Sequence, residues 1–412
     1  MRARCAADLK AAADAGLRAC DFGDIYTGVE VLVGRFVASR LDGAHGRAPL
    51  LLHTKLVPDL ERLATFDGGA AREVVLRSCA RLQTGYVDLL QLHWWDLAVP
   101  RYVDVAAALV PLRDEGLVRE IGLTNFGLQQ TRELVEAGVP VAATQVQLSL
   151  LDRRPIASGL AAYCAQHDVS ILAYGSLAGG LLSDRYLGAP PPDPDYRALE
   201  TRSLTKYMLI VDEVGGWGAL QALLQRLRGI ADRLGGGTTI ARLALAWCLA
   251  QPAVASAIVG ARSPKHIDDQ IASVRLQLDA ATLAEVQAAA DECLTPVPGE
   301  VYALERQRDG VHGAIMRYNL QALGNDAHLA ELQERAEAAL SSLAQRRRAI
   351  SEQHGGAPSE RAHARAAALR CDAQLRAAVR ELALVAGPYA GEDPARAARA
   401  RELSERFEHA LA

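Results

Sequence analysis

Short apolar segments alternate with segments of helical periodicity along most of the chain, and this alternation constrains the fold more than any other feature. Strands are expected at residues 18–22, 49–54, 86–93, 117–123, 141–147, 169–174 and 255–259. Helices are expected between and after them, at 6–17, 28–40, 70–83, 102–115, 127–137, 155–167, 217–234, 238–250, 264–273 and 281–292. Steady alternation with short connections is typical of an all-parallel α/β sheet. The pattern therefore predicts a parallel barrel.

A complete (β/α)8 TIM-type barrel has eight strands, and the strand pattern supplies one fewer. Met1 leads directly into a helical segment, so the strand that is missing is the first. The predicted fold is therefore an N-terminally truncated (β/α)8 barrel, with two ladder edges exposed where a closed barrel has none. Residues 176–215 are rich in Gly and Pro and are expected to form a long loop over the barrel mouth.

The character of the chain changes near residue 320. Residues 326–352 and 359–386 are charged, Ala-rich helical segments, and a last helix is expected to begin after Asp393-Pro394. The predicted organisation is a barrel over residues 1–319 and a C-terminal α-helical extension, a hairpin or short bundle, over residues 320–412. Two readings of this extension stay open. It is either a solvated packing appendage or a surface for self-association or for a partner.

Composition excludes several classes of function. The formal net charge is −4 with both signs intermixed, which argues against binding to nucleic acid or to an anionic membrane. Seven scattered cysteines without a CxxC pair indicate reduced thiols and no metal site. The N-terminus lacks the apolar core of a secretory signal, and no apolar run approaches the roughly 20 residues of a membrane span. A cytoplasmic location is expected.

Ionisable side chains stand at the ends of three successive predicted strands. Asp21 and Tyr26 follow the strand at 18–22, Lys55 follows the next, and His93 ends the third. A parallel barrel brings such strand ends together on one face. Each of these residues alone is better interpreted as an ordinary surface or core side chain. Together they form a plausible set for reducing a carbonyl group.

Reduction of a carbonyl by hydride needs a proton donor to the forming alkoxide, and this set can supply one. The ordinary pKa of tyrosine is about 10, so Tyr26 holds its proton at neutral pH. A nearby Lys55 ammonium makes the phenol a better acid by stabilising phenolate, and Asp21 keeps that lysine charged and in place. A neutral His93 can donate a hydrogen bond to the carbonyl oxygen and orient it.

Several longer motifs resemble the aldo-keto reductase superfamily over residues 5–318 or so. The most specific is Arg81-Leu82-Gln83-Thr84-Gly85-Tyr86-Val87-Asp88-Leu89-Leu90-Gln91-Leu92-His93-Trp94. Ile121-Gly122-Leu123-Thr124-Asn125-Phe126 is similar to the strand-end motif of the family, and Gly179-Gly180-Leu181-Leu182 to one of its loops. Pro298-Gly299-Glu300-Val301-Tyr302 and Leu304-Glu305-Arg306 resemble the C-terminal part of one subset.

The resemblance implies NAD(P)H-dependent reduction of a small aldehyde or ketone to an alcohol. In that scheme Tyr26 is the general acid, Lys55 and Asp21 tune it, and His93 orients the substrate. The implied cofactor contacts are Thr124, Asn125 and Gln145 to the carboxamide, Tyr174 stacking on the nicotinamide, Gly175, Ser176 and Leu177 to the pyrophosphate, and Gly260, Arg262, Lys265 and Gln270 at the adenosine end. Arg262 and Lys265 are candidates for a 2′-phosphate, which favours NADPH over NADH.

Two substitutions depart from the family pattern. Phe22 follows Asp21 where a small or hydroxyl residue is usual, and Asp269-Gln270 replaces an acid-Asn pair that holds adenine. The helical extension and the missing strand keep a second function open, a nucleotide-binding regulatory or scaffold protein with little turnover. The loops 94–101, 176–215 and 296–315 would shape the substrate pocket, and composition does not predict their conformations. The sequence therefore does not identify the substrate.

Overall fold

A computed structural model describes residues 2–25, 28–41, 50–191, 202–260, 264–307, 310–316 and 394–411, with a few isolated positions between 337 and 345. The chain divides into two compact units, Met1–Met316 and Arg317–Ala412. The first unit carries all the strands found in the described residues.

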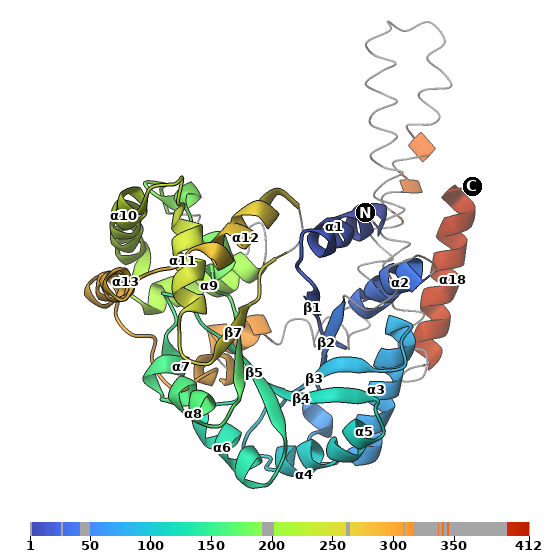
Figure 1. Ribbon diagram of the computed structural model, residues 1–412. Coiled ribbons are helices and arrows are strands. Elements are labelled where there is room, and N and C mark those ends of the chain that lie inside the picture. The colour runs from blue at the N-terminus through green and yellow to red at the C-terminus, as the bar shows by residue number, and fades with distance from the viewer. Residues whose placement is uncertain are drawn as a thin grey trace, which may run out of the picture. The chain divides into compact units, whose positions relative to one another are not determined.

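A single sheet of seven parallel strands organises the first unit, and its spatial order follows the chain. The strands are β1 (Ala19–Asp21), β2 (Leu51–Leu56), β3 (Val87–His93), β4 (Val118–Thr124), β5 (Val141–Gln147), β6 (Ser170–Tyr174) and β7 (Val254–Ala257). The sheet curls as a barrel wall does, with helices outside it (Figure 1). Among the described residues β1 and β7 do not pair with each other, so the sheet is open. The predicted parallel α/β barrel fold is confirmed.

The helices of the first unit follow the predicted alternation. They are α1 (Arg2–Asp14), α2 (Val29–Leu41), α3 (Gly68–Leu82), α4 (Tyr102–Ala107), α5 (Val110–Asp114), α6 (Leu128–Glu136), α7 (Arg154–Ala157), α8 (Leu160–Gln166), α10 (Gly216–Leu234), α11 (Ile240–Leu249), α12 (Ile267–Arg275), α13 (Ala280–Cys293) and α14 (Ala303–Arg306). The helix predicted at 102–115 is two helices, and Pro111, which has no N–H to donate, stands in the first turn of the second. The helix predicted at 155–167 also divides, at Gly159, whose φ is +80°.

The prediction of a long loop over residues 176–215 is wrong for its second half. Residues 202–213 form the helix α9 (Arg202–Glu213), and the described part before it contains only two short 3₁₀ turns. Leu204, Met208 and Val211 recur at helical spacing in α9, and all three are buried. The loop was predicted from the Gly and Pro content of residues 176–215 as a whole. That content comes mainly from the residues before α9, so it masked the helical periodicity of α9 itself.

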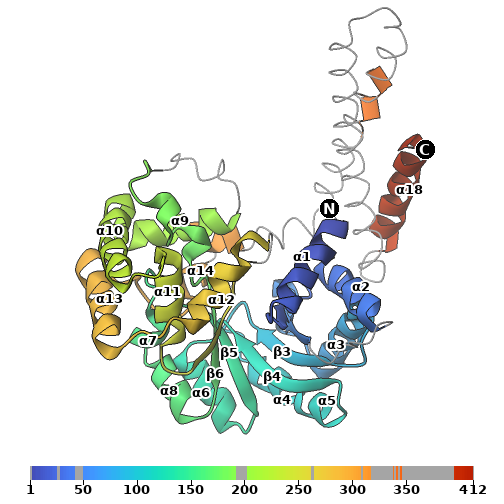
Figure 2. The same cartoon turned by 45° about the horizontal axis from the view of Figure 1, so that its top comes forward.

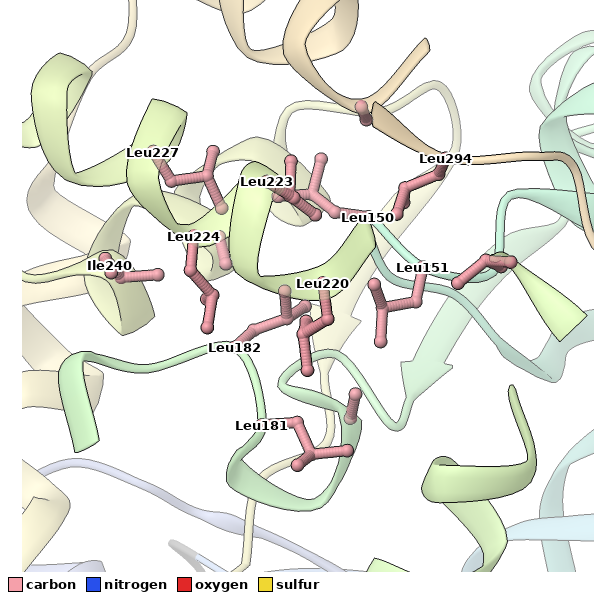
Figure 3. Packing of buried hydrophobic residues seen from close by; sticks show 14 of the residues in the cluster. Leu150, Leu151, Leu181, Leu182, Leu220, Leu223, Leu224, Leu227, Ile240 and Leu294 are labelled. Atoms are coloured by element: carbon pink, nitrogen blue, oxygen red, sulfur yellow. The ribbon is translucent and has the colours of Figure 1, made fainter. Parts of the chain in front are cut away.

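A leucine-rich cluster joins α9, α10, α11 and α13, which gather on one side of the first unit (Figure 2). Leu220, Leu223, Leu224 and Leu227 form one buried face of α10 at helical spacing. Against this face lie apolar residues of the segments that follow β5 and β6, Leu150, Leu151, Leu181 and Leu182 (Figure 3). The core thereby anchors the two loops that leave the ends of these strands.

The second unit is described mainly through one helix, α18 (Pro394–Leu411), where a last helix was predicted. Its buried residues Ala400, Leu403, Ser404 and Phe407 recur at helical spacing. Arg406 forms a salt bridge with Glu337 of the same unit at 3.5 Å. The helical segments predicted at 326–352 and 359–386 lie outside the described residues, apart from the isolated positions. None of the described helices is both long and apolar enough to cross a membrane.

Candidate active site

Asp21 and Lys55 meet at the ends of β1 and β2. The two strands pair in parallel with Asp21 opposite His53, which puts Lys55 one step further along the same face. The Lys55 ammonium donates to Asp21 Oδ1 at 2.5 Å and to the carbonyl oxygen of Phe22 at 2.8 Å. Both side chains are nearly enclosed, at 6% and 13% exposure. Phe22, the departure from the family pattern, therefore holds Lys55 through its backbone.

The second oxygen of Asp21 connects this pair to a residue expected to bind cofactor. Asp21 Oδ2 accepts from the amide nitrogens of Gln91 at 2.7 Å and Gln145 at 2.8 Å. Gln145 also donates to Gln91 Oε1 at 2.7 Å. Both N–H groups of Gln145 are thus used within the site, and its Oε1 remains to accept a bond from a ligand. One hydrogen-bond network spans the ends of β1, β2, β3 and β5.

His93 lies at the end of β3 and is buried, with 4% of its surface exposed. Its ring packs edge-on against the rings of Trp95 and Tyr302, with centroids 4.5 and 5.6 Å away. Burial, together with the charge of Arg306, lowers the pKa of His93 to about 3, so the ring is neutral at physiological pH. Nδ1 lies 3.2 Å from the carbonyl oxygen of Thr124. A carbonyl only accepts, so this contact favours the tautomer with its proton on Nδ1, in which Nε2 is an acceptor.

Tyr174 and Asn125 form the next part of the site, at the ends of β6 and β4. The Tyr174 hydroxyl donates to Asn125 Oδ1 at 2.8 Å. Asn125 has a φ of +63°, an uncommon conformation for a residue other than glycine that clusters at functional sites. Lys206 of α9 lies against the tyrosine, with Nζ 4.5 Å from the centre of its ring and 3.4 Å from its hydroxyl. Burial lowers the pKa of Lys206 to about 8. In this conformation an ammonium covers one face of the ring that is expected to stack on nicotinamide.

The loop that follows Tyr174 offers a row of backbone donors. Among the described residues, the N–H groups of Gly175, Ser176 and Leu177 donate to no backbone carbonyl. Successive N–H groups of this kind form a concave site for an oxyanion such as pyrophosphate. Gly175 has a φ of +68°, and a Cβ atom there would lie 2.4 Å from the Tyr207 hydroxyl oxygen. Only glycine fits this approach between the loop and α9.

The residues expected at the adenosine end lie beyond β7. Gln270 of α12 donates from Nε2 to the carbonyl oxygen of Gly260 at 3.3 Å, and Lys265 is exposed. Asp269 accepts from Arg242 of α11 at 2.5 Å. A cavity of about 480 Å³ lies beside these residues, and its lining includes Arg242, Asp268 and Arg275.

Of the side chains predicted for the site, Tyr26 and Arg262 lie outside the described residues. Gly260, Lys265 and Gln270 lie beyond β7, and the structure brings the other predicted residues to the carboxyl ends of the strands. There, one contiguous set of contacts joins Asp21, Lys55, Gln145, Thr124, His93, Asn125 and Tyr174. Gln91 was missed, although its position two residues before His93 in the same strand puts both on one face. Lys206 was also missed, and Tyr302 and Arg306 were noted only as parts of the C-terminal motif, without a role in the site. The described residues contain no cluster of side chains suited to hold a metal ion.

A buried ion cluster fixes the segment that contains Tyr302 and Arg306. Arg154 donates to both carboxylate oxygens of Glu305, at 2.9 and 3.1 Å, and to both of Asp152, at 2.7 and 3.0 Å. All three side chains are at most 3% exposed. Burial alone would raise the pKa of Glu305, but the charge and hydrogen bonds of Arg154 outweigh it and hold that pKa below its ordinary range. We call residues 300–306 the strap.

Asp24 is a buried carboxyl group that this network does not include. It lies between β1 and α2 at 8% exposure, and its Oδ1 atom has no hydrogen-bond partner. Burial, together with the charge of the neighbouring Glu30, raises the pKa of Asp24 to about 8, against the opposing charges of Arg77 and Arg81. The folded state therefore holds a proton here that an unfolded aspartate, with a pKa of about 3.9, releases.

This difference predicts a pH-dependent stability. The folded state binds more protons between about pH 4 and about pH 8, so the free energy of unfolding should fall as pH rises through that window. Asn at position 24 carries no charge, and Asp24→Asn should be more stable than the parent at about pH 9 and close to it at about pH 4. Thermal melts across this range, with the exposed Asp104→Asn as control, measure the effect. Equal melting temperatures at high pH would contradict it.

Comparison with known proteins assigns the fold to a family. The family model described as Aldo/keto reductase family matches residues 2–291. The flagellar radial spoke protein 5 of Chlamydomonas reinhardtii is 34% identical over 243 residues, 51% of this chain and 46% of that protein. The aldo-keto reductase YhdN of Bacillus subtilis is 29% identical over 272 residues, 63% of this chain and 75% of that protein.

The solved structures agree on the fold. An aldo-keto reductase from Klebsiella pneumoniae in complex with NADPH superimposes with a TM-score of 0.51 at 24% identity, over 70% of this chain and 84% of that chain. At that identity the likeness establishes fold alone. The chain spans about half the length, 46%, of the radial spoke protein it matches.

Proposed function

The chain belongs to the aldo/keto reductase family, and we propose that it reduces an aldehyde or ketone to the alcohol, reversibly, with NADPH. The observation that carries the proposal is the bonding of Asp21 to both Lys55 and Gln145. This carboxylate links the ammonium that would tune the proton donor with the amide that would hold the nicotinamide. An ion pair that served only the stability of the fold would not need the hydrogen bond from Gln145 to Asp21.

The described residues fit the cofactor at two places. The row of N–H donors at Gly175, Ser176 and Leu177 suits a pyrophosphate. Gln145 Oε1 and the Asn125 amide nitrogen, which donates to no described residue, together suit the acceptor and donor ends of a carboxamide. NADPH, when bound, supplies the hydride. Lys206 must leave the ring of Tyr174, or the cofactor must take the opposite face.

The remaining chemistry is proton transfer, which falls to the chain itself. Tyr26 would donate its proton to the oxygen of the forming alkoxide, and the Lys55 ammonium would stabilise the phenolate left behind. Asp21 holds that ammonium at the strand ends. The hydroxyl group so formed can donate to Nε2 of the neutral His93, which orients the alcohol. We therefore assign to His93 the role of acceptor from the alcohol, and not that of donor to the carbonyl.

The direct test is turnover with purified protein. NADPH and a panel of aldehydes and ketones are mixed with the full chain, and the loss of absorbance at about 340 nm is followed. Loss of signal that requires both the carbonyl compound and the protein supports the proposal. Binding of NADPH without consumption, for every compound and at every pH tried, would count against it.

A second candidate is a nucleotide-binding regulatory or scaffold protein with little turnover. The ammonium of Lys206 over the Tyr174 ring favours it, because that arrangement obstructs a productive nicotinamide site. The name of the radial spoke relative and the separate unit at Arg317–Ala412 point the same way. This function predicts tight NADPH binding, negligible turnover, and self-association that is lost when residues 317–412 are deleted. Light scattering on the two chains distinguishes it from the first.

A further inference from the structure

Arg306 brings a cation to the reacting end of the site from the strap. Its Nη2 atom donates to the carbonyl oxygen of Asn125 at 2.7 Å and to that of Trp94 at 3.4 Å. These residues directly follow Thr124 and His93, at the ends of β4 and β3. The guanidinium carbon lies 5.2 Å from the centre of the Tyr302 ring, which also packs edge-on against His93. The Tyr302 ring therefore contacts both Arg306 and His93.

No carboxylate of the described residues forms an ion pair with Arg306. Among the described residues Arg306 forms no salt bridge, although the strap contains Glu305 next to it. Glu305 is already bound through both oxygens to Arg154. Asp96, the other acidic neighbour, is exposed and accepts from the backbone of Ala98. The Arg306 Nε atom is buried and has no hydrogen-bond partner.

An enclosed guanidinium without a carboxylate, and with an unused N–H group, is unfavourable unless an anion binds there. Its planar fork of donors matches a carboxylate or a phosphate, the two common oxyacid groups of small metabolites. Tyr302 contacts both Arg306 and His93, so the guanidinium lies close to the histidine. A neutral His93 adds no second charge beside Arg306.

We propose that Arg306 binds a carboxylate or phosphate group on the carbonyl substrate, and so makes the enzyme selective for anionic aldehydes and ketones. This inference rests on the proposed reductase function. Lys206, whose Nζ lies against the Tyr174 hydroxyl that donates to Asn125, is a second cation in the site and favours the same class of substrate. The strap acts as a specificity element, and its buried anchor at Arg154 determines where the guanidinium lies.

The test compares matched substrates that differ only in charge. The pairs are para-carboxybenzaldehyde with its methyl ester, and glyceraldehyde phosphate with glyceraldehyde. In the parent protein kcat/KM should be higher for the anionic member of at least one pair. Arg306→Met should lower that value by about 10- to 100-fold, the range of a lost charge-assisted hydrogen bond, and leave the neutral member within about threefold. Arg306→Lys should fall between, and the exposed Arg113→Met should match the parent.

The outcomes separate the possible failures. If Arg306→Met lowers kcat/KM for the anionic member of only one pair, that pair shows whether the bound group is a carboxylate or a phosphate. Either result supports the inference. Equal losses for charged and neutral members would reduce Arg306 to a structural residue and overturn it, as would a parent protein that prefers neutral compounds.

Calorimetric binding of benzoate against benzamide, with NADPH present, provides a readout that does not depend on turnover. If no carbonyl compound is reduced, the proposed function fails, yet benzoate binding lost in Arg306→Met would still support an anion site. Equal binding of benzoate by parent and variant would overturn the inference.

Discussion

Replacing Lys55 with methionine is expected to lower kcat for carbonyl reduction by about 10²- to 10⁴-fold, the usual contribution of a positioned acid or base. The physical reason is that the ammonium stabilises the phenolate that Tyr26 leaves behind, and methionine fills a similar volume without charge. Without the cation the phenol is a weaker acid, so the pH above which the rate declines should move upward. Tyr26→Phe should cause a loss in the same range.

The two substitutions should not add. If Lys55 acts through Tyr26, the double variant is no slower than the slower single variant, whereas independent roles multiply the losses. NADPH binding, measured by fluorescence, should survive, because Gln91 and Gln145 still hold Asp21. The exposed Lys10→Met is the matched control. Normal turnover in Lys55→Met would remove the ammonium from the mechanism.

Lys55→Met also leaves the Asp21 carboxylate without its cation, which can destabilise the fold. Asp21→Asn combined with Lys55→Met removes that uncompensated charge and should melt at a higher temperature than Lys55→Met alone. Turnover should not recover with it. This pair of measurements separates loss of the proton donor from loss of structure.

The strand pattern was predictable because parallel strands buried on both faces are continuous apolar runs. The positions of the candidate catalytic residues Asp21, Lys55 and His93 could be predicted for a related reason, since each lies at the carboxyl end of such a run. Gln91 was within reach of the same argument, through the two-residue period of a strand. Its polar side chain is completely buried in β3, which is unusual enough to suggest a role.

The residues that periodicity could not provide are those that reach the site from distant parts of the chain. Arg306 bonds to a backbone carbonyl 181 residues earlier, and Arg154 to a carboxylate 151 residues later. The motif around Arg306 gave no role for it, and nothing local distinguishes Arg154 from a solvated arginine, because both roles depend on how the strap folds back. Lys206 was not predicted as a site residue for a different reason, because the composition of its segment indicated a loop where the helix α9 forms.

The strap yields the second large prediction. Arg154→Met should lower the free energy of unfolding by about 3–5 kcal/mol, the cost of breaking a buried ion pair from one side. Methionine leaves the carboxylates of Asp152 and Glu305 enclosed and without their cation. Urea unfolding measures the loss. Arg226→Met, which breaks an ion pair with Glu292 at 3.0 Å on an exposed surface, should unfold as the parent does.

Neutralising the two stranded carboxylates tests whether charge is the cause. Asp152→Asn and Glu305→Gln, added to Arg154→Met, remove the uncompensated charges and should recover part of the lost stability, because a neutral buried group costs less than an unpaired ion. Activity should not recover with it, because the strap then lacks the fork that fixes Arg306 and Tyr302. If the triple variant is no more stable than Arg154→Met, the loss of stability comes from packing and not from unpaired charge. In that case apolar contacts, and not the ion cluster, hold the strap in place.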